Sequence, residues 1–428
     1  MANIPRRVAV LGGARIPFAR SGTAHAEASN QDMLTAAFSA LVDKFSLKGE
    51  RIGEVAAGAV IKHSRDWNLA REATLGCGLD PATPAYDLQR ACGTSLSAAA
   101  QLANRIALGE IDSAIAGGSD STSDVPLAYG KKLQRAVLKF SRSKDFGEKI
   151  STLGHLRPTD LAPMPPSVGE PRTGLSMGEH CEEMAKAWKV SRREQDELAL
   201  ASHRNAAAAW KAGFFDDLVY ELNGIKADNN VRGDTSMEKL ASLRTAFDRS
   251  EAGTLTAGNS SPLTDGAASV LLAAEAWASA RQLAPLAFMT YSETAAVDFI
   301  GMTGDKEGML LAPAYAVPRM LERAGLTLQD FDIYEIHEAF AAQVLCTLKA
   351  WESDAWCRKR LNRPALGSID RAKLNPVGSS VALGHPFAAT GARILATAAK
   401  QLQRRGGGRA LISICAAGGM GVTAILER

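Results

Sequence analysis

The sequence predicts an α/β protein in which helices cover both faces of a mostly parallel sheet. Two observations support this prediction. Short apolar runs have the length of buried strands, and alanine-rich segments of helical length separate them. The expected strands are residues 7–11, 54–60, 113–117, 268–272, 331–336 and 411–415, and the clearest helices are residues 95–108 and 390–404.

Two stretches of the chain share one layout and suggest an internal repeat. In the first, Cys92 precedes a small-residue helix, and the apolar run 112–119 follows with two glycines near its end. In the second, His385 precedes a helix, and the run 409–419 also ends in two glycines. This layout suits two similar halves with a site between them.

Residues 125–253 break the alternating pattern. Residues 131–160 carry eight basic and three acidic side chains, and the proline-rich segment 163–166 follows. A charge run of this kind is commonly a solvated helical face, and the alternative is a surface for nucleotide phosphates, anionic lipid or a partner subunit. We therefore predict an N-terminal half at 1–124 that continues at 254–278, an inserted domain at 125–253 and a C-terminal half at 279–428.

Composition limits the classes of function. The 428 residues are 46% hydrophobic and 22% charged, and the net charge of +3 gives no general affinity for nucleic acid. We expect no signal peptide and no membrane-spanning helix. The six cysteines lack the spacing of a zinc site or a disulfide framework, which favours a reducing, cytoplasmic compartment and a protein without a bound metal.

Cys92 is the first candidate catalytic residue. It lies at a predicted strand-to-helix turn and is followed by Gly93 and a helix. Free N–H groups and the dipole at a helix N-terminus favour the thiolate, which is the form that attacks carbonyl carbons. A buried structural cysteine would be the better interpretation of Cys92 alone. The small residues around it favour a site that a bulky substrate can approach.

Three further turns present a histidine or a cysteine. His385 is held between Gly384 and Pro386 and suits a general base for a thiol. Cys415 ends a predicted strand, and the glycine-rich turn after it offers N–H groups for an oxyanion hole. His337 follows another strand and could donate a hydrogen bond to a substrate carbonyl. Taken alone, Cys415 or His337 would be interpreted as a buried structural residue. Four turns that each present a cysteine or a histidine at the end of a strand indicate one common site.

These four blocks, in this order and spacing, resemble the thiolase family over essentially the whole chain. The resemblance implies a duplicated five-layer αβαβα fold, an inserted loop domain that grips coenzyme A, and a homodimer or homotetramer. It implies no cofactor, with acyl-CoA and coenzyme A as substrates. The supporting segments are residues 15–18, 117–120, 175–178, 243–247 and 256–267.

The resemblance also assigns roles by position. Cys92 matches the acylated nucleophile, His385 the base that activates it, and Cys415 the acid/base for the second substrate. One oxyanion hole would use His337 with His385, and the other would use the N–H groups of Cys92 and Ala417. The residues that match coenzyme A contacts are Arg232, Ser261 and Met177.

Two features are similar to the beta subunits of fatty-acid oxidation trifunctional complexes. His337 stands where most thiolases have asparagine, and the basic insert around 131–166 is long. In that group the insert is linked to membrane contact and to a partner that carries hydratase and dehydrogenase activities. Two departures from the family pattern concern the site geometry: Ala417 and Ala388 stand where glycine is usual.

The resulting hypothesis is a 3-ketoacyl-CoA thiolase of fatty-acid beta-oxidation that works through an acyl group on Cys92. A thiolase that makes acetoacetyl-CoA in the biosynthetic direction is the nearest alternative. A decarboxylating ketoacyl synthase would not need Cys415. A non-catalytic scaffold that binds coenzyme A would not need both Cys92 and Cys415.

Overall fold

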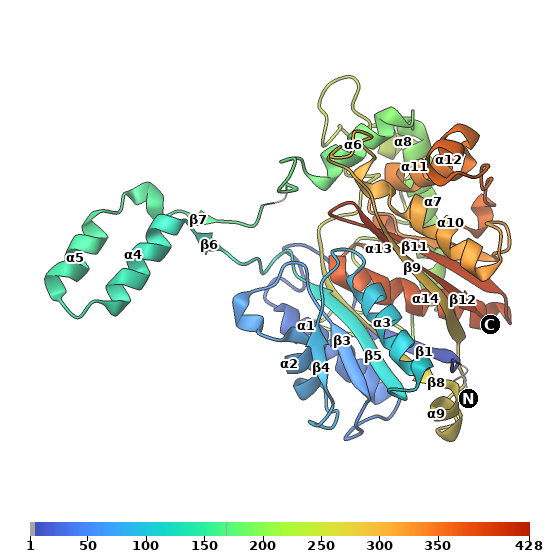
Figure 1. Cartoon of the computed structure of the whole chain (residues 1–428), viewed down its shortest axis with the longest axis horizontal. Helices are drawn as coiled ribbons and strands as arrows, with labels where there is room; N and C mark the ends of the chain where they lie inside the picture. The colour runs from blue at the N-terminus through green and yellow to red at the C-terminus, as the bar shows by residue number, and fades with distance from the viewer. Residues whose placement is uncertain (1–4, 168) are drawn as a thin grey trace.

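The computed structural model describes residues 5–167 and 169–428, which form five layers in which helices and sheets alternate (Figure 1). The strands are β1 (Val8–Arg15), β2 (Ala19–Arg20), β3 (Glu54–Ala57), β4 (Ala85–Asp87), β5 (Ser113–Asp120), β6 (Ala128–Tyr129), β7 (Pro163–Met164), β8 (Thr264–Ala274), β9 (Ala287–Ala296), β10 (Ile333–Ile336), β11 (Arg409–Ala416) and β12 (Met420–Glu427). The helices are α1 (Asn30–Lys44), α2 (Leu69–Gly76), α3 (Thr94–Leu108), α4 (Lys131–Arg142), α5 (Phe146–Gly154), α6 (Met177–Ala187), α7 (Arg192–Lys211), α8 (Met237–Ala241), α9 (Glu275–Ala280), α10 (Pro313–Ala324), α11 (Ala341–Glu352), α12 (Asp354–Leu361), α13 (Ser380–Leu383) and α14 (Thr390–Arg405).

The large sheet is mixed, so the prediction of a mostly parallel sheet is wrong. Along the order β10-β11-β12-β9-β1-β8-β5-β3-β4, three neighbouring pairs are parallel and five are antiparallel. The turn from β11 to β12 is too short for a crossover, so that these strands must pair antiparallel. The strands β9 and β12, which the sequence analysis did not predict, lie in the antiparallel part.

The alternation of side chains along each strand builds the layers. On β1, Val8 and Val10 pack into a central cluster with α3 and α14, whereas Ala9 and Leu11 face the cluster that contains α1 and α2. On β11, Ile412 likewise faces the central cluster. The opposite face of β11 packs on α10 and α11. Helices α3 and α14 therefore form a middle layer between the two halves, as Figure 1 shows.

The N-terminal ends of α3 and α14 are in direct contact. An added Cβ on Gly391 would lie 2.4 Å from the backbone nitrogen of Leu96, so only glycine permits this approach. The Ser95 hydroxyl accepts a hydrogen bond of 2.8 Å from the backbone N–H of Ala392. Because Cys92 precedes one helix and His385 the other, this contact brings two predicted site residues together.

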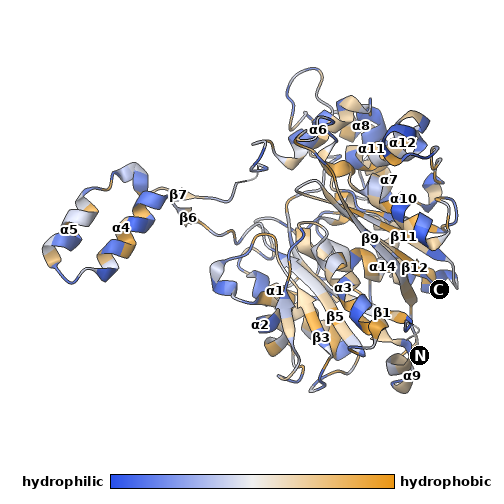
Figure 2. Ribbon diagram, viewed as in Figure 1, coloured by the Kyte–Doolittle hydropathy of each residue, from blue (hydrophilic) through white to orange (hydrophobic). Residues whose placement is uncertain are grey.

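Between β5 and β8 the chain leaves the sheet and forms α4 to α8. Helices α4 and α5 project from the body on the short strands β6 and β7 (Figure 1), and neither helix has a buried residue. Figure 2 shows hydrophobic and hydrophilic positions mixed along both helices. Among the described residues, no helix combines the length and the apolar character that crossing a bilayer requires. The bounds of the three predicted domains stay a prediction.

Candidate active site

Cys92 lies in a tight turn directly before α3. The preceding residue, Ala91, has φ of 43°, a left-handed conformation that is unusual for a residue with a side chain. Thr94 stabilises this turn, because its hydroxyl donates to the carbonyl of Ala91 at 2.7 Å and accepts from the N–H of Arg90 at 2.9 Å. The turn presents a half-buried sulfur at the edge of the middle layer.

His385 meets this sulfur from the other half of the molecule. Its Nε2 lies 3.0 Å from Cys92 Sγ, and its Nδ1 lies 2.7 Å from the hydroxyl of Thr390. When Nδ1 carries the proton and donates to Thr390, Nε2 is free to accept the thiol proton. Gly384 has φ of 104°, and an added Cβ there would lie 2.7 Å from Asn230 Nδ2. A glycine is therefore needed to turn the chain into this position.

Burial favours the neutral form of both members of the pair. Burial raises the pKa of Cys92 to about 12, and nearby Asp120 adds to this effect. Burial, together with the charge of Arg393, lowers the pKa of His385 to about 3. Burial of the sulfur therefore opposes the thiolate that the helix N-terminus favours. The thiol can lose its proton to His385 as it attacks a carbonyl carbon.

Cys415 and His337 line the same region. Cys415 is buried near the end of β11, and burial followed by the proximity of Cys92 raises its pKa well above the ordinary value. His337 is buried directly after β10, and its ring centroid lies 4.2 Å from that of His385. Burial, followed by electrostatic repulsion between the protonated rings of His337 and His385 and by the charge of Arg393, lowers the pKa of His337 well below its ordinary value. The structure thus brings all four predicted catalytic side chains together.

Among the described residues, Cys92, His337 and His385 are the one group that could hold a metal ion, with one ligand atom from each lying within 4.8 Å of the others. The same set of atoms also suits acyl transfer, because it contains a nucleophile and a base in hydrogen-bond contact. The absence of a bound metal stays a prediction.

The backbone of Ala417 completes the surroundings of Cys92. The backbone N–H of Ala417 lowers the pKa of the Cys92 thiol, which partly offsets burial. Gly418 and Gly419 follow with φ of 78° and 71°, so that the chain reverses into β12 at this point. An oxyanion hole formed by the N–H groups of Cys92 and Ala417 stays a prediction.

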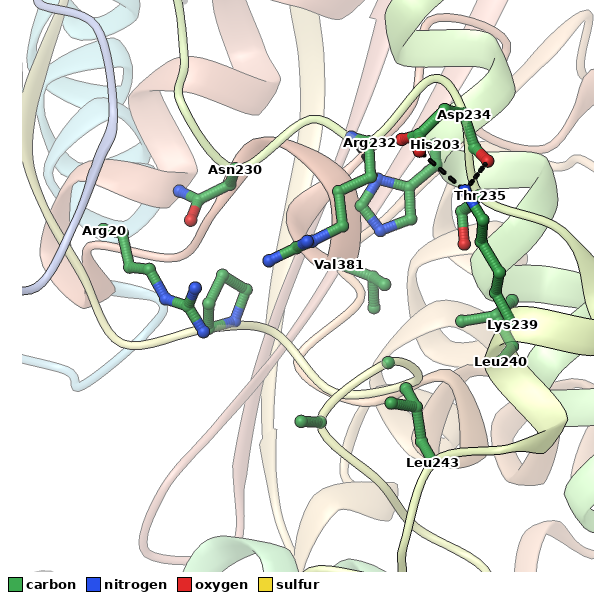
Figure 3. Close-up of a pocket in the computed structure, with 13 residues that line it drawn as sticks. Arg20, His203, Asn230, Arg232, Asp234, Thr235, Lys239, Leu240, Leu243 and Val381 are labelled. Carbon is green, nitrogen blue, oxygen red and sulfur yellow. Dashed lines mark hydrogen bonds and ion pairs between the residues drawn. The ribbon is translucent and has the colours of Figure 1, made fainter.

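A cavity of about 370 Å³ lies beside the site (Figure 3). Arg20, Arg232 and Lys239 give it positive charge, and Asp234 forms an ion pair with Lys239 at 2.7 Å. His203 is neutral, because burial lowers its pKa to about 4. Apolar side chains cover part of the wall, and one of them, Val381, belongs to α13 and follows Ser380 in the chain. The apolar lining residues are Leu240, Leu243, Ala257, Pro262 and Val381.

The three predicted coenzyme contacts have different positions. Arg232 lines the cavity. Ser261 does not, although its neighbour Pro262 does, and its hydroxyl donates to the carbonyl of Ala339 at 2.8 Å. Met177 begins α6 and packs against the cluster that contains Cys415. The structure thus places Arg232 in the cavity, whereas Ser261 and Met177 are not among the residues that line it.

Two site residues have little or no signal in the sequence, because they act through contacts between distant segments. Thr390 holds His385, and Asp120 accepts hydrogen bonds from the N–H groups of Val60, Ile61 and Ala388. Burial raises the pKa of Asp120 to about 7. The only sequence signal for Asp120 was its place at the end of the segment 117–120.

Comparison with known proteins agrees with this geometry. The sequence model of the thiolase N-terminal domain matches residues 8–276, and that of the thiolase C-terminal domain matches residues 291–428. The chain belongs to the thiolase family. It is 42% identical to a 3-ketoacyl-CoA thiolase of Yersinia pestis (strain Pestoides F), over 98% of this chain and 97% of that protein.

Solved structures of thiolases share the fold. The acetyl-CoA acetyltransferase of Bacillus anthracis superposes with a TM-score of 0.82 and 30% identity, over the full length of both chains. A human mitochondrial 3-ketoacyl-CoA thiolase in complex with CoA gives a TM-score of 0.80 and 28% identity, over 99% of this thiolase and 98% of that chain. The predicted α/β class and five-layer thiolase fold are therefore confirmed.

Proposed function

We propose that this thiolase is a 3-ketoacyl-CoA thiolase, which cleaves a 3-ketoacyl-CoA with coenzyme A into acetyl-CoA and a shortened acyl-CoA. The observation that carries the proposal is the contact of 3.0 Å between Cys92 Sγ and His385 Nε2, beside a second thiol, Cys415. The name of the Yersinia pestis relative supports the choice of substrate.

The first half-reaction transfers the acyl group to Cys92. His385 Nε2 takes the thiol proton while the sulfur adds to the 3-keto carbon, and the N–H groups of Cys92 and Ala417 stabilise the oxyanion. The bond between C2 and C3 then breaks, and its electron pair forms the enolate of acetyl-CoA. Cys415 protonates C2 of this enolate and is left as a thiolate.

The second half-reaction releases the acyl group. The Cys415 thiolate takes the proton of an incoming coenzyme A thiol, and the coenzyme sulfur attacks the thioester on Cys92. Cys92 leaves and recovers its proton from His385, so that every group returns to its starting state. His337, with His385, would hold the thioester oxygen of the enolate.

The cationic cavity supports coenzyme A as the carrier of the acyl group. Arg20, Arg232 and Lys239 suit the phosphates of a nucleotide, and the leucines beside them suit its base. The cavity reaches Val381, the neighbour of Ser380 on α13, and Ser380 contacts His337. A nucleotide bound there would direct its thioester arm toward the catalytic residues.

Thiolysis of 3-ketoacyl-CoA substrates from short to long chains tests the proposal. We expect turnover of substrates longer than acetoacetyl-CoA, with acetyl-CoA as one product. Activity restricted to acetoacetyl-CoA would instead support the second candidate, an acetoacetyl-CoA thiolase in the biosynthetic direction. The similarity to the Bacillus anthracis acetyl-CoA acetyltransferase favours that alternative. If mass spectrometry detected no acyl adduct on Cys92, the remaining hypothesis would be a non-catalytic scaffold that binds coenzyme A.

We further propose that the thiolase works in fatty-acid beta-oxidation in the cytoplasm, as a homodimer or homotetramer. The projecting α4–α5 hairpin supports an external contact, because it exposes apolar residues among many basic ones. Peripheral contact of 131–166 with anionic membranes, or with a subunit that carries hydratase and dehydrogenase activities, fits this composition. The exposed apolar residues are Val137, Leu138, Phe140, Phe146, Ile150 and Leu153.

Cosedimentation with vesicles tests the membrane contact. We expect the full chain to bind vesicles that contain phosphatidylserine and not neutral phosphatidylcholine vesicles. A variant without α4 and α5 should lose this binding and keep thiolysis. Equal vesicle binding by the full chain and by the variant without α4 and α5 would contradict a role for the hairpin.

A further inference from the structure

His337 has one ring nitrogen held by the protein and one without a partner. Its Nδ1 lies 2.8 Å from the hydroxyl oxygen of Ser380. Its Nε2 is buried and makes no hydrogen bond within the described residues. A buried polar atom without a partner is costly, and at a catalytic site it indicates a contact that forms with substrate. What this nitrogen can do depends on whether it carries a proton.

Arg393 determines the direction of the hydrogen bond between Ser380 and His337. Arg393 Nη2 lies 2.6 Å from Ser380 Oγ, and a guanidinium can only donate. Ser380 Oγ therefore accepts from Arg393, and its own proton is directed to Nδ1 of His337, its other contact. In the opposite tautomer, Nδ1 would donate to Ser380, and the serine proton would have no acceptor among the described residues.

Burial favours the neutral form of His337, and Arg393 adds to this effect. The arginine is 2% exposed, and burial lowers its pKa to about 10, so that it remains a cation near neutral pH. The nearby carboxyl groups of Glu335 and Glu338 stabilise that charge. A cation so close opposes a second charge on the imidazole. His337 is thus a hydrogen-bond donor because of its tautomer and not because it is charged.

The backbone holds Ser380 in place. The N–H of Ser379 donates to the hydroxyl of Ser202 at 3.1 Å, and the N–H of Val381 donates to Glu338 at 3.2 Å. Helix α13 therefore has little freedom to turn the serine away from His337. Within the described residues, the hydroxyl of Ser379 hydrogen-bonds only to Arg393, at 3.3 Å, and not to His337.

We propose that Ser380 and Arg393 are positioning residues that fix His337 in the tautomer with the proton on Nε2, so that Nε2–H donates to the thioester oxygen of the substrate. The inference rests on the proposed function for the nature of that oxygen. The assignment of the tautomer stands on the contacts of the free protein alone.

The tautomer is measured directly by NMR of the protein labelled with ¹⁵N-histidine, without substrate. His337→Asn identifies the signals of His337. We expect a protonated Nε2 and an unprotonated Nδ1 in the wild-type protein, and a mixed or reversed pattern in Ser380→Ala. A protonated Nδ1 in the wild-type protein would overturn the proposal even if Ser380→Ala failed to fold.

Kinetics tests the consequence for catalysis. Complete loss of one oxyanion-hole donor reduces kcat about 100-fold to 1,000-fold. In Ser380→Ala, kcat should fall in proportion to the fraction of His337 that keeps the proton on Nε2, by about tenfold when that fraction is about one tenth, with little change in KM. Ser380→Thr retains the hydroxyl and should restore kcat. Ser379→Ala is the matched control and should keep the tautomer and kcat of the wild-type protein.

The two proposals fail in different ways. Unchanged ¹⁵N signals and unchanged kcat in Ser380→Ala would refute the roles of Ser380 and Arg393 and leave the thiolase activity intact. Absence of thiolysis by the wild-type protein would refute the proposed function, while the NMR result would still report the tautomer.

Discussion

The hydrogen bond between Thr390 and His385 gives a sharp test of the site. Thr390 Oγ1 lies 2.7 Å from His385 Nδ1, and both residues are buried. Thr390→Val keeps the shape of the side chain and removes the hydroxyl. The variant leaves Nδ1–H without an acceptor, and the ring can relieve this by moving its proton to Nε2, where it faces Cys92.

The magnitude follows from the cost of a buried donor without a partner. Such a group costs about 1–3 kcal/mol. A tautomer with the proton on Nε2 cannot accept the Cys92 proton, so this free energy adds to the barrier for acylation. At 1.36 kcal/mol for each factor of ten, acylation should slow by about 5-fold to 150-fold.

Rapid quenching after mixing with acetyl-CoA, followed by mass spectrometry of the Cys92 peptide, measures acylation directly. Thr397→Val is the matched control, because Thr397 lies on the same helix α14 and its hydroxyl makes no hydrogen bond within the described residues. We expect slow acylation in Thr390→Val and normal acylation in Thr397→Val. Equal rates in Thr390→Val and the wild-type protein would refute the role of this hydrogen bond.

Three further predictions address the second thiol, the cavity and a buried carboxyl. Cys415→Ser should still form an acetyl adduct on Cys92 from acetyl-CoA. Its thiolysis rate should fall about 100-fold or more, because the variant lacks the acid/base for the second substrate. A normal rate of thiolysis would exclude that role for Cys415. Arg232→Ala should raise KM for coenzyme A about tenfold at unchanged kcat, because a charge-assisted hydrogen bond contributes about 1.5–3 kcal/mol, whereas exposed Arg244→Ala should not. Burial raises the pKa of Glu335 from 4.5 to about 7, so the stability given by the protonated form is present below pH 4.5 and is lost as the pH rises through 7. Urea titrations measure the unfolding free energy of Glu335→Gln and of the wild-type protein at each pH. The difference between the two should shift by about 3 kcal/mol in favour of Glu335→Gln as the pH rises from 4.5 to 8. If the two plots of unfolding free energy against pH ran parallel, the pKa of Glu335 would not be raised.

The sequence predicted much of the fold because local patterns encode it. The apolar runs at 7–11 and 113–117 became β1 and β5, and the alanine-rich segments at 95–108 and 390–404 became α3 and α14. The same patterns could not show strand direction. The antiparallel neighbours of β1 are β8 and β9, which lie far away in the sequence, and apolar runs look alike in either direction.

The sequence by itself determined which reactive side chains stand at strand ends and before helices: Cys92, His337, His385 and Cys415. Only the tertiary structure decided how they are protonated and what holds them. Cys92 and His385 are 293 residues apart and meet because α3 and α14 pack together. Burial shifts both pKa values, and Asp120 adds to the shift of Cys92 while Arg393 adds to that of His385. Desolvation and long-range charges depend on three-dimensional packing, and no local sequence pattern records them.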